Sequence, residues 1–109
     1  MTVDWDIRNY DQVESTQATC FELARSSAEQ GAVVRAKAQS AGKGRHGREW
    51  ETGENNLAFS CLLKPQCDVQ NVGQLALVVG VALAQTFQKF VEAPISLKWP
   101  NDVYIDGKT

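Results

Sequence analysis

The glycine-rich segment of residues 39–50 contains the residue types that most directly suggest chemistry. It reads Gln-Ser-Ala-Gly-Lys-Gly-Arg-His-Gly-Arg-Glu-Trp. Its glycines let the backbone turn and bring N–H groups close to a ligand, and its Lys and Arg side chains can donate to phosphate or carboxylate oxygens. The segment therefore predicts a mobile loop that captures an anion, with Trp50 as a stacking surface at its exit. A solvated basic loop is the alternative interpretation.

A second group of polar residues lies in the sequence Lys-Trp-Pro-Asn-Asp at residues 98–102. Lys98 can neutralise an anion, and Trp99 can form the wall of an apolar pocket. Asn101 and Asp102, at the end of a predicted strand, can hold a divalent cation, a ribose or an ordered water. The same two residues also stabilise turns through their own backbone, so a purely structural role stays open.

Ser15 and Thr16 directly precede a helical pattern. Either hydroxyl is a good N-cap, because it can accept a hydrogen bond from the free N–H groups of the first turn. A helix N-terminus with hydroxyls and free N–H groups also suits a polar ligand. Capping alone is the competing interpretation.

The elements that must position these residues follow from hydrophobic periodicity and turn signals. Residues 7–13 predict an edge strand, residues 16–30 a helix that ends before Gly31, and residues 57–63 a buried strand. Residues 32–39 alternate with a period of two, which predicts a strand that places Val34, Ala36 and Ala38 on one face and delivers Gln39 to the mouth of the loop. The inward positions predicted for the helix are Cys20, Leu23, Ala24 and Ala28.

The second half of the chain predicts a long helix and a hairpin. From residue 69 or 72 to residue 90 the sequence is apolar on nearly all sides, which predicts a largely buried central helix in which Gly73 and Gly80 allow close approach of a neighbour. Residues 95–99 predict a strand. Residues 103–108 predict another strand that enters a tight turn at Asp106-Gly107.

Composition limits the class of protein. With 109 residues, 43% hydrophobic residues and a formal charge of −2, we expect one globular α+β domain. Three cysteines without a Cys-x-x-Cys pair, and a single His, predict reduced and mostly buried thiols, without a metal site among them. We expect a cytoplasmic protein without a signal peptide, and the apolar run at residues 75–84 is too short to span a membrane. Because Glu49 and Glu51 offset the positive charge of the loop, we predict no surface that binds nucleic acid.

Together these segments resemble the catalytic domain of biotin protein ligases, also called biotin–acetyl-CoA-carboxylase ligases. Three motifs match in the family's order: residues 14–17 resemble its Ser-Thr-Asn site, residues 39–50 its Gly-Arg-Gly-Arg-x-Gly-Arg-x-Trp loop, and residues 98–102 its Lys-Trp-Pro-Asn-Asp signature. Gln17 stands where Asn is usual, and Lys43 where Arg is usual. The resemblance implies an α+β fold with a mixed or antiparallel sheet packed with helices, like that of class II aminoacyl-tRNA synthetases.

The resemblance also implies an ATP-dependent reaction in two steps. Biotin is activated to biotinyl-5′-AMP with release of pyrophosphate, and is then transferred to a lysine of a biotin carboxyl carrier protein. By motif position, the implied biotin-binding residues are Ser15, Thr16, Gln17, Gln39, Gly42, Lys43, Gly44, Arg45 and Lys108. The implied ATP-binding residues are Arg48, Trp50, Lys98, Asn101 and Asp102. Arg45 and Lys108 would be catalytic and Asp102 would bind Mg²⁺, although a gapless match places the family's lysine at Thr109.

The family's catalytic domain continues for several more strands, usually followed by a small β-barrel domain. We therefore expect this chain to be the N-terminal part of that domain, without a preceding DNA-binding domain, and inactive alone if those strands complete the site. An unpaired strand edge at residues 103–105 predicts self-association, such as a homodimer. The alternatives are a lipoate or octanoate ligase or transferase of the related fold, and a non-catalytic anion-binding module. No nucleic acid and no membrane is expected as a partner.

Overall fold

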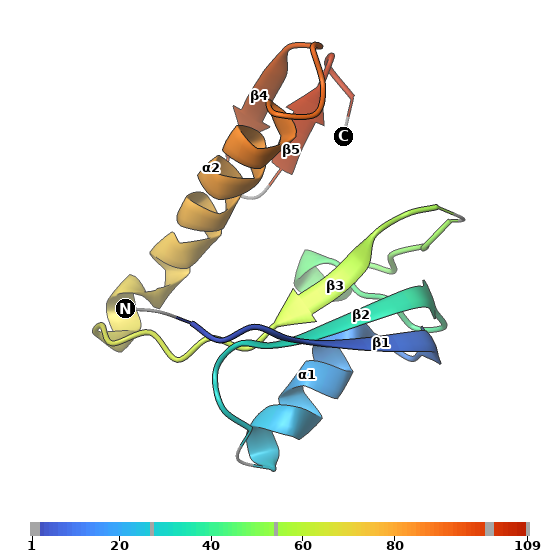
Figure 1. Cartoon of the computed structure of the whole chain (residues 1–109), viewed down its shortest axis with the longest axis vertical. Coiled ribbons are helices and arrows are strands. Elements are labelled where there is room, and N and C mark those ends of the chain that lie inside the picture. The colour runs from blue at the N-terminus through green and yellow to red at the C-terminus, as the bar shows by residue number, and fades with distance from the viewer. Residues whose placement is uncertain (1–2, 27, 54, 100–101, 109) are drawn as a thin grey trace. The chain divides into compact units, whose positions relative to one another are not determined.

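The computed structural model describes residues 3–26, 28–53, 55–99 and 102–108, apart from the side chain of Arg45. Two compact units divide the chain, Met1–Lys64 and Pro65–Thr109, and each is described by itself. In chain order the helices and strands are β1 (Asp6–Val13), α1 (Thr16–Arg25), β2 (Ala32–Gln39), η1 (Arg45–Gly47), β3 (Ala58–Cys61), η2 (Val69–Gln74), α2 (Leu75–Phe87), β4 (Ile95–Lys98) and β5 (Asp102–Ile105) (Figure 1).

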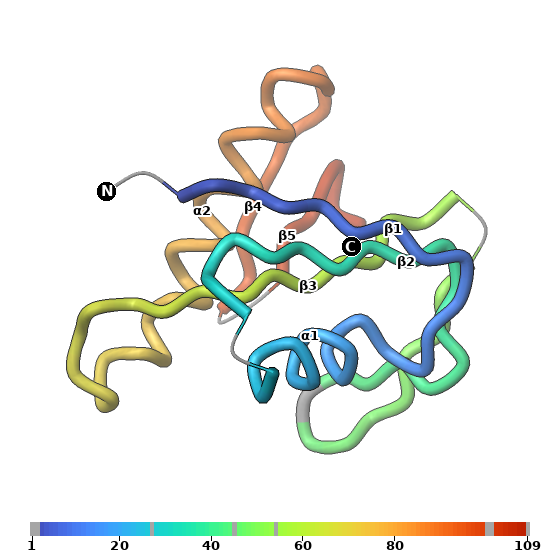
Figure 2. Tube along the Cα trace, turned by 60° about the horizontal axis from the view of Figure 1, so that its bottom comes forward, coloured from blue at the N-terminus to red at the C-terminus, as the bar shows by residue number. Residues whose placement is uncertain are grey.

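The first unit is a three-stranded mixed sheet with one helix on it. Its strand order is β1-β2-β3, with β1 parallel and β3 antiparallel to β2. Because parallel neighbours need a crossover, the chain between β1 and β2 forms α1, which runs along the sheet in Figure 2. The mixed sheet packed with a helix confirms the predicted fold class, and β1 is an edge strand as expected.

The core of the first unit lies between α1 and β2. Val34 is fully buried, and Ala32, Ala36 and Cys20 are the other buried apolar residues in the described part of the chain. The small Ala side chains on either side of Val34 leave room for the helix. The predicted bounds of β2 are confirmed, but Ala38 is only half-buried, and β3 is shorter than the predicted strand at residues 57–63.

Helix α1 ends at Arg25, five residues before the predicted end at Gln30. The Ser26 N–H bonds to the carbonyls of Glu22 and Leu23, and the Ala28 N–H bonds at 3.0 Å to the carbonyl of Leu23, five residues earlier, so the regular helical hydrogen bonding stops here. Gly31 is therefore not a helix cap. It has a φ of 101° and donates its N–H to the carbonyl of Leu62. This hydrogen bond places the start of β2 beside the end of β3. Ala24, predicted to point inward, is exposed.

The second unit is a helix followed by a β-hairpin. Strands β4 and β5 are antiparallel, and Lys98 and Asp102 are Cα partners at their joined ends. The predicted tight turn at Asp106-Gly107 is confirmed: both residues have positive φ, 54° and 75°, and Ile105 and Lys108 exchange backbone hydrogen bonds across it. This is the geometry that favours Asp-Gly in two-residue hairpin loops.

The prediction of a largely buried central helix is wrong for α2 as the structure describes it. None of its residues is buried, and Val78, Val79 and Val81 are exposed large hydrophobic side chains. The role predicted for the glycines is also wrong, because an added Cβ at Gly73 would meet nothing within 4 Å and one at Gly80 would meet only Leu97 at 3.8 Å. The amino-acid composition of α2 indicates its apolar character correctly, but it does not indicate which residues pack against the helix.

The continuous helical segment is longer than the apolar run at residues 75–84. Val69–Phe87 covers 19 residues with a mean hydropathy of 1.2, which is long and apolar enough, by length and composition only, to cross a membrane. Core helices of globular domains meet the same criteria, so the segment alone assigns no membrane.

The three cysteines are free, but only Cys20 is buried, whereas Cys61 and Cys67 are exposed. The expectation of mostly buried thiols is therefore wrong for two of them. Burial raises the pKa of the Cys20 thiol above its usual value, and the nearby Cys61 raises it further. Cys20 therefore stays a neutral thiol within the core.

Candidate functional site

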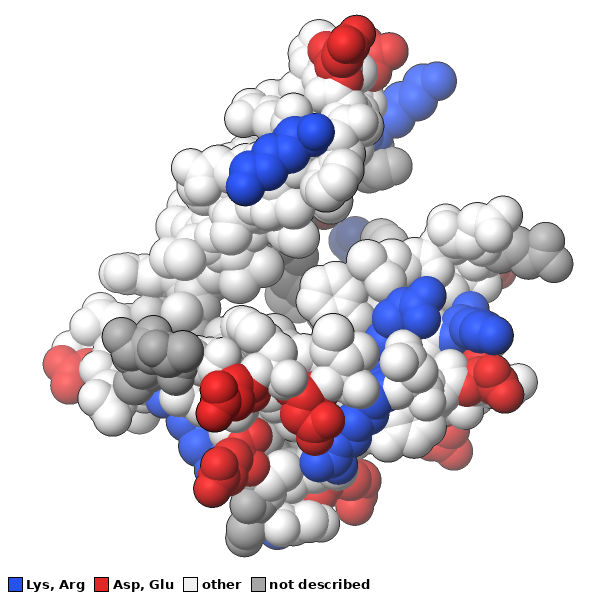
Figure 3. All heavy atoms as spheres, in the orientation of Figure 1, with Lys and Arg blue, Asp and Glu red and all other residues white. Residues whose placement is uncertain are grey.

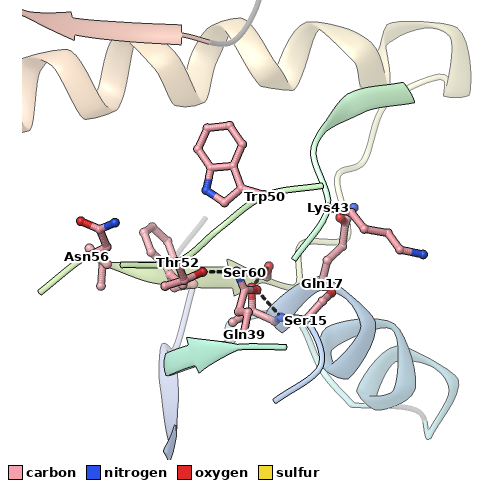
Figure 4. A pocket seen from close by; sticks show the side chains of 12 residues that line it. Ser15, Gln17, Gln39, Lys43, Trp50, Thr52, Asn56 and Ser60 are labelled. Carbon is pink, nitrogen blue, oxygen red and sulfur yellow. Dashed lines mark hydrogen bonds between the residues drawn. The ribbon is translucent and has the colours of Figure 1, made fainter. Parts of the chain in front are cut away.

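A cavity of about 270 Å³ opens in the first unit where α1 begins. It lies between the N-terminus of α1, the end of β2, the exit of the loop and β3. Its lining residues are Ser15, Thr16, Gln17, Gln39, Lys43, Trp50, Thr52, Asn56, Leu57, Ala58, Phe59 and Ser60 (Figure 4). The cavity thus brings together six residues of two sequence motifs, namely Ser15, Thr16, Gln17, Gln39, Lys43 and Trp50.

The N-terminus of α1 forms one side of the cavity floor. Ser15 has an extended backbone, with φ −159° and ψ 139°, and its Oγ accepts from the Ala18 N–H at 2.9 Å. The predicted N-cap is therefore confirmed at Ser15. The Thr16 N–H donates to Oε1 of Gln39 at 2.8 Å. Two backbone donors of the first turn are thus satisfied, while the hydroxyl proton of Ser15 has no partner among the described residues.

Gln39 connects the helix to the loop exit. Its Oε1 accepts from the Thr16 N–H, and its Nε2 donates to Oγ1 of Thr52 at 3.0 Å. These two contacts fix which end of the amide is oxygen. Within the described part of the chain, the second N–H of Gln39 is left to donate to a ligand.

Ser60 of β3 completes the floor. The Oγ of Ser60 is 2.9 Å from Oγ1 of Thr16, a pair separated by 44 residues in the chain. In Figure 4 the ring of Trp50 stands above the floor that Ser15, Gln39 and Ser60 form, and Trp50 is 63% exposed. The floor therefore offers hydroxyl and amide groups, and the ring above it is available for stacking.

The glycine-rich loop has a hydrogen-bonded stem. Trp50 donates its N–H to the carbonyl of Gly42 at 2.8 Å, and Gly44 donates to the carbonyl of Arg48 at 2.7 Å. Between these bonds, Lys43 and Glu49 form an antiparallel bridge. An added Cβ at Gly42 would lie 2.6 Å from the Trp50 carbonyl oxygen and 3.0 Å from Nε2 of Gln39. Only glycine therefore permits this close approach.

The tip of the loop turns with two residues in the left-handed region. His46 has φ 61° and ψ 30°, and Gly47 has φ 74°. This turn leaves Lys43, His46 and Arg48 exposed. The charges predicted to meet an anion are thus held in solvent at the end of an ordered stem.

The remaining predicted site residues belong to the second unit. Lys98 ends β4 and is exposed, Asp102 begins β5 and is half-buried, and Lys108 lies exposed after the Asp106-Gly107 turn. Asn101 and Thr109 lie outside the described residues. The hairpin brings Lys98 and Asp102 opposite each other, so a cation and a carboxylate are neighbours there.

Charged side chains of both signs are interspersed over the first unit on the face that Figure 3 shows. Ion pairs at the surface join Arg8 to Asp6 and Lys37 to Asp11. Among the described residues, no group of three or more His, Cys, Asp and Glu could hold a metal ion. Asp102 is thus a single carboxylate, which is enough for Mg²⁺ only when nucleotide phosphates supply further ligands.

Sequence reasoning missed Thr52, Asn56 and Ser60 as lining residues. Asn56 and Thr52 lie in a segment whose composition indicates only a turn, and Ser60 lies in a short apolar strand. The alternation of β3, in which Ala58 and Ser60 are half-buried and Phe59 and Cys61 are exposed, is the one signal that could have placed Ser60 on the inner face.

A sheet crossed by one helix, with a polar cavity at the helix N-terminus and a glycine-rich cationic loop beside it, has a geometry that suits a small polar ligand with an anionic group. The chain belongs to the Biotin/lipoate A/B protein ligase family, which matches residues 10–108.

Named relatives are similar over most of this chain. The bifunctional ligase/repressor BirA of Bacillus subtilis is 39% identical over 100 residues, which cover 91% of this chain and 31% of the relative. The biotin–[acetyl-CoA-carboxylase] ligase of Paracoccus denitrificans is 36% identical over 98 residues, covering 88% of this chain and 40% of the relative. The chain thus spans well under half the length of these relatives.

Solved structures agree with this assignment. The biotin protein ligase from Aquifex aeolicus in complex with biotin and ATP has a TM-score of 0.79 and 38% identity, covering 92% of this chain and 41% of that one. The biotin acetyl coenzyme A carboxylase synthetase from Helicobacter pylori with bound biotinylated ATP has a TM-score of 0.72 and 30% identity, covering 94% and 50%. The resemblance read from the three motifs is confirmed.

Proposed function

We propose that this chain carries the biotin- and ATP-binding motifs of a cytoplasmic ATP-dependent biotin protein ligase. Its reaction would activate biotin to biotinyl-5′-AMP with release of pyrophosphate, and then transfer biotin to a lysine of a biotin carboxyl carrier protein. The observation that carries the proposal is the cavity floor, where the hydroxyls of Ser15 and Thr16 and the amide of Gln39 converge beside a cationic loop.

The floor suits the ureido ring of biotin. A cyclic urea presents one carbonyl acceptor and two N–H donors. Ser15 can donate its hydroxyl proton and Gln39 its second N–H, while Thr16 and Ser60 share a hydroxyl pair that can accept. Because a buried polar ligand group needs its hydrogen bonds made, this pattern favours a ureido ring over a purely apolar ring.

The loop suits the reaction centre. In the first step the carboxylate of biotin attacks the α-phosphate of ATP, so two anions must approach each other. Lys43, Arg45 and Arg48, together with N–H groups of the loop, would offset that repulsion, and Trp50 would pack against the adenine. An ordered stem that closes over the ligand would also keep the mixed anhydride away from water.

The second unit would supply the remaining contacts. Lys98, Asn101 and Asp102 would bind ATP, and Asp102 would hold Mg²⁺, which adds positive charge beside the phosphates when bound. Lys108, or the position of Thr109, would hold the biotin carbonyl and the reacting phosphate. The edge of β5 would favour a homodimer, a proposal that a monomeric sedimentation profile at high concentration would contradict.

The deciding experiment is biotin-dependent exchange of labelled pyrophosphate into ATP. It compares this 109-residue chain with a version extended through the further strands of a family catalytic domain. Exchange by either protein, dependent on biotin, supports the proposal. Exchange by the extended version alone locates part of the site beyond residue 109.

Two controls separate the alternatives. Lipoate and octanoate replace biotin in the same assay, and faster exchange with either acid would transfer the assignment to a ligase of that acid. If neither protein catalyses exchange with any acid, and biotin does not raise the melting temperature, the results would favour the non-catalytic anion-binding module over a ligase.

A further inference from the structure

Ser60 lies on the cavity floor but belongs to none of the three motifs. We propose that Ser60 is a positioning residue that accepts the hydroxyl proton of Thr16, so that Thr16 Oγ1 becomes an acceptor for a ligand N–H. The basis is the 2.9 Å contact between the two hydroxyl oxygens. The inference rests on the proposed function, because the ligand N–H is that of the ureido ring.

The position of Thr16 in its helix explains why it needs such a partner. A threonine inside a helix can donate its hydroxyl proton to the carbonyl four residues earlier, as Thr86 in α2 does to Ala82 at 2.8 Å. Thr16 is the first residue of α1, and the residue four positions earlier, Gln12, belongs to β1. The usual acceptor of a helical threonine is therefore absent at this position.

The nearby acceptors are engaged elsewhere. The Oγ of Ser15 receives the N–H of Ala18, and Oε1 of Gln39 receives the backbone N–H of Thr16. Thr16 is only 5% exposed, so bulk water does not readily replace a protein acceptor. Among the described lining residues, Ser60 is the hydroxyl group placed to take the Thr16 proton.

The direction of this hydrogen bond decides what Thr16 can recognise. With its proton directed at Ser60, Thr16 Oγ1 offers lone pairs to a ligand N–H. Without Ser60, the proton would turn toward the ligand and oppose an N–H donor. The pair therefore favours a ligand ring that carries N–H groups. The dithiolane ring of lipoate carries none, so the pair would discriminate between the two acids that the family description covers.

A double-mutant cycle on the 109-residue chain tests the inference, with the biotin dissociation constant measured by calorimetry. Ser60→Ala should raise the biotin dissociation constant about tenfold, since the Thr16 hydroxyl proton is then directed at the ligand N–H instead of at Ser60. In a Thr16→Val background the same change should cost less than about twofold, because the group that Ser60 orients is gone. Ser60→Thr keeps the hydroxyl and should bind biotin within about threefold of wild type.

Ser96→Ala, at an exposed serine of β4, is the control and should leave the dissociation constant unchanged. Circular dichroism checks folding, and Ser60→Cys, a poor acceptor of similar volume, replaces Ser60→Ala if that variant unfolds. Equal losses from the Ser60 change in both backgrounds, or no loss in either, would overturn the positioning role alone. If the wild-type 109-residue chain binds no biotin, the same cycle is measured in the version extended through the further strands. Absence of biotin binding by that version too would overturn the proposed function, and the role of Ser60 with it.

Discussion

The floor of the cavity consists of buried and half-buried residues joined by neutral hydrogen bonds, whereas the loop beside it is exposed and carries positive charge. Ser15 and Thr16 are 7% and 5% exposed, and their hydroxyls have partners at 2.9 Å. Lys43 and Arg48 are exposed. A hydroxyl can be buried at low cost once its hydrogen bond is made, but a buried cation loses its hydration. The fold therefore orders the neutral part of the candidate site by internal hydrogen bonds and leaves the charges of the loop in water.

Gly42 joins the two regions, so its substitution should have the largest effect. In Gly42→Ala the added Cβ would press on the Trp50 carbonyl and on Gln39, which must shift together. We expect a loss of about 2 kcal/mol in the free energy of unfolding and at least about a tenfold weaker affinity for biotin. Urea unfolding followed by Trp fluorescence, together with calorimetry, measures both.

Gly73→Ala is the matched control for this change. No heavy atom lies within 4 Å of a Cβ built there, so stability and biotin affinity should stay near those of wild type. Equal effects of the two alanines would show that the close approach at Gly42 does not organise the site.

The floor can be tested separately through the helix cap. Ser15→Ala removes the acceptor for the Ala18 N–H and should cost about 1 kcal/mol of unfolding free energy. Biotin should also bind more weakly, because the hydroxyl donor is lost. Ser15→Asp retains a capping side chain but has no proton to donate when ionised, so it should recover the stability without restoring the affinity. Recovery of both would assign Ser15 to capping alone.

The loop should respond in the opposite way. Arg48→Ala removes an exposed cation and should change the unfolding free energy by less than about 0.5 kcal/mol. ATP affinity, measured by calorimetry, should fall about tenfold, because a charge-assisted contact is lost. Arg25→Ala removes an exposed arginine from the other end of α1 and should leave ATP affinity unchanged. A matching loss in both variants would indicate a general charge effect.

The smallest effect is expected at the loop tip. His46 occupies the left-handed region, which glycine adopts without steric cost, while glycine also gains entropy in the unfolded chain. His46→Gly should therefore change stability by no more than about 0.5 kcal/mol and leave biotin affinity unaltered. His46→Asn, which also tolerates this conformation, serves as the comparison. A large loss of biotin affinity in both variants would place His46 in the binding site.

Local patterns predicted much of the first unit. The alternation at residues 32–39 predicted the bounds of β2, and the Ser15 hydroxyl before a helical pattern predicted the N-cap. The end of α1 was predicted too late, because the Ala28 N–H bonds to the Leu23 carbonyl and ends the regular helical hydrogen bonding there, which residue propensities do not report. The burial of α2 was also predicted wrongly, because an apolar sequence does not reveal what lies against it.

The sequence by itself determined the three motifs, their order, the glycines that permit a close loop stem and the hydroxyls that begin α1. Only the tertiary structure decided that Ser60 meets Thr16 across 44 residues and that Gln39 connects Thr16 to Thr52. The physical reason is that turns, caps and strand period depend on neighbours in the chain. Contacts between distant residues depend on sheet register and on how α1 packs against β2 and β3.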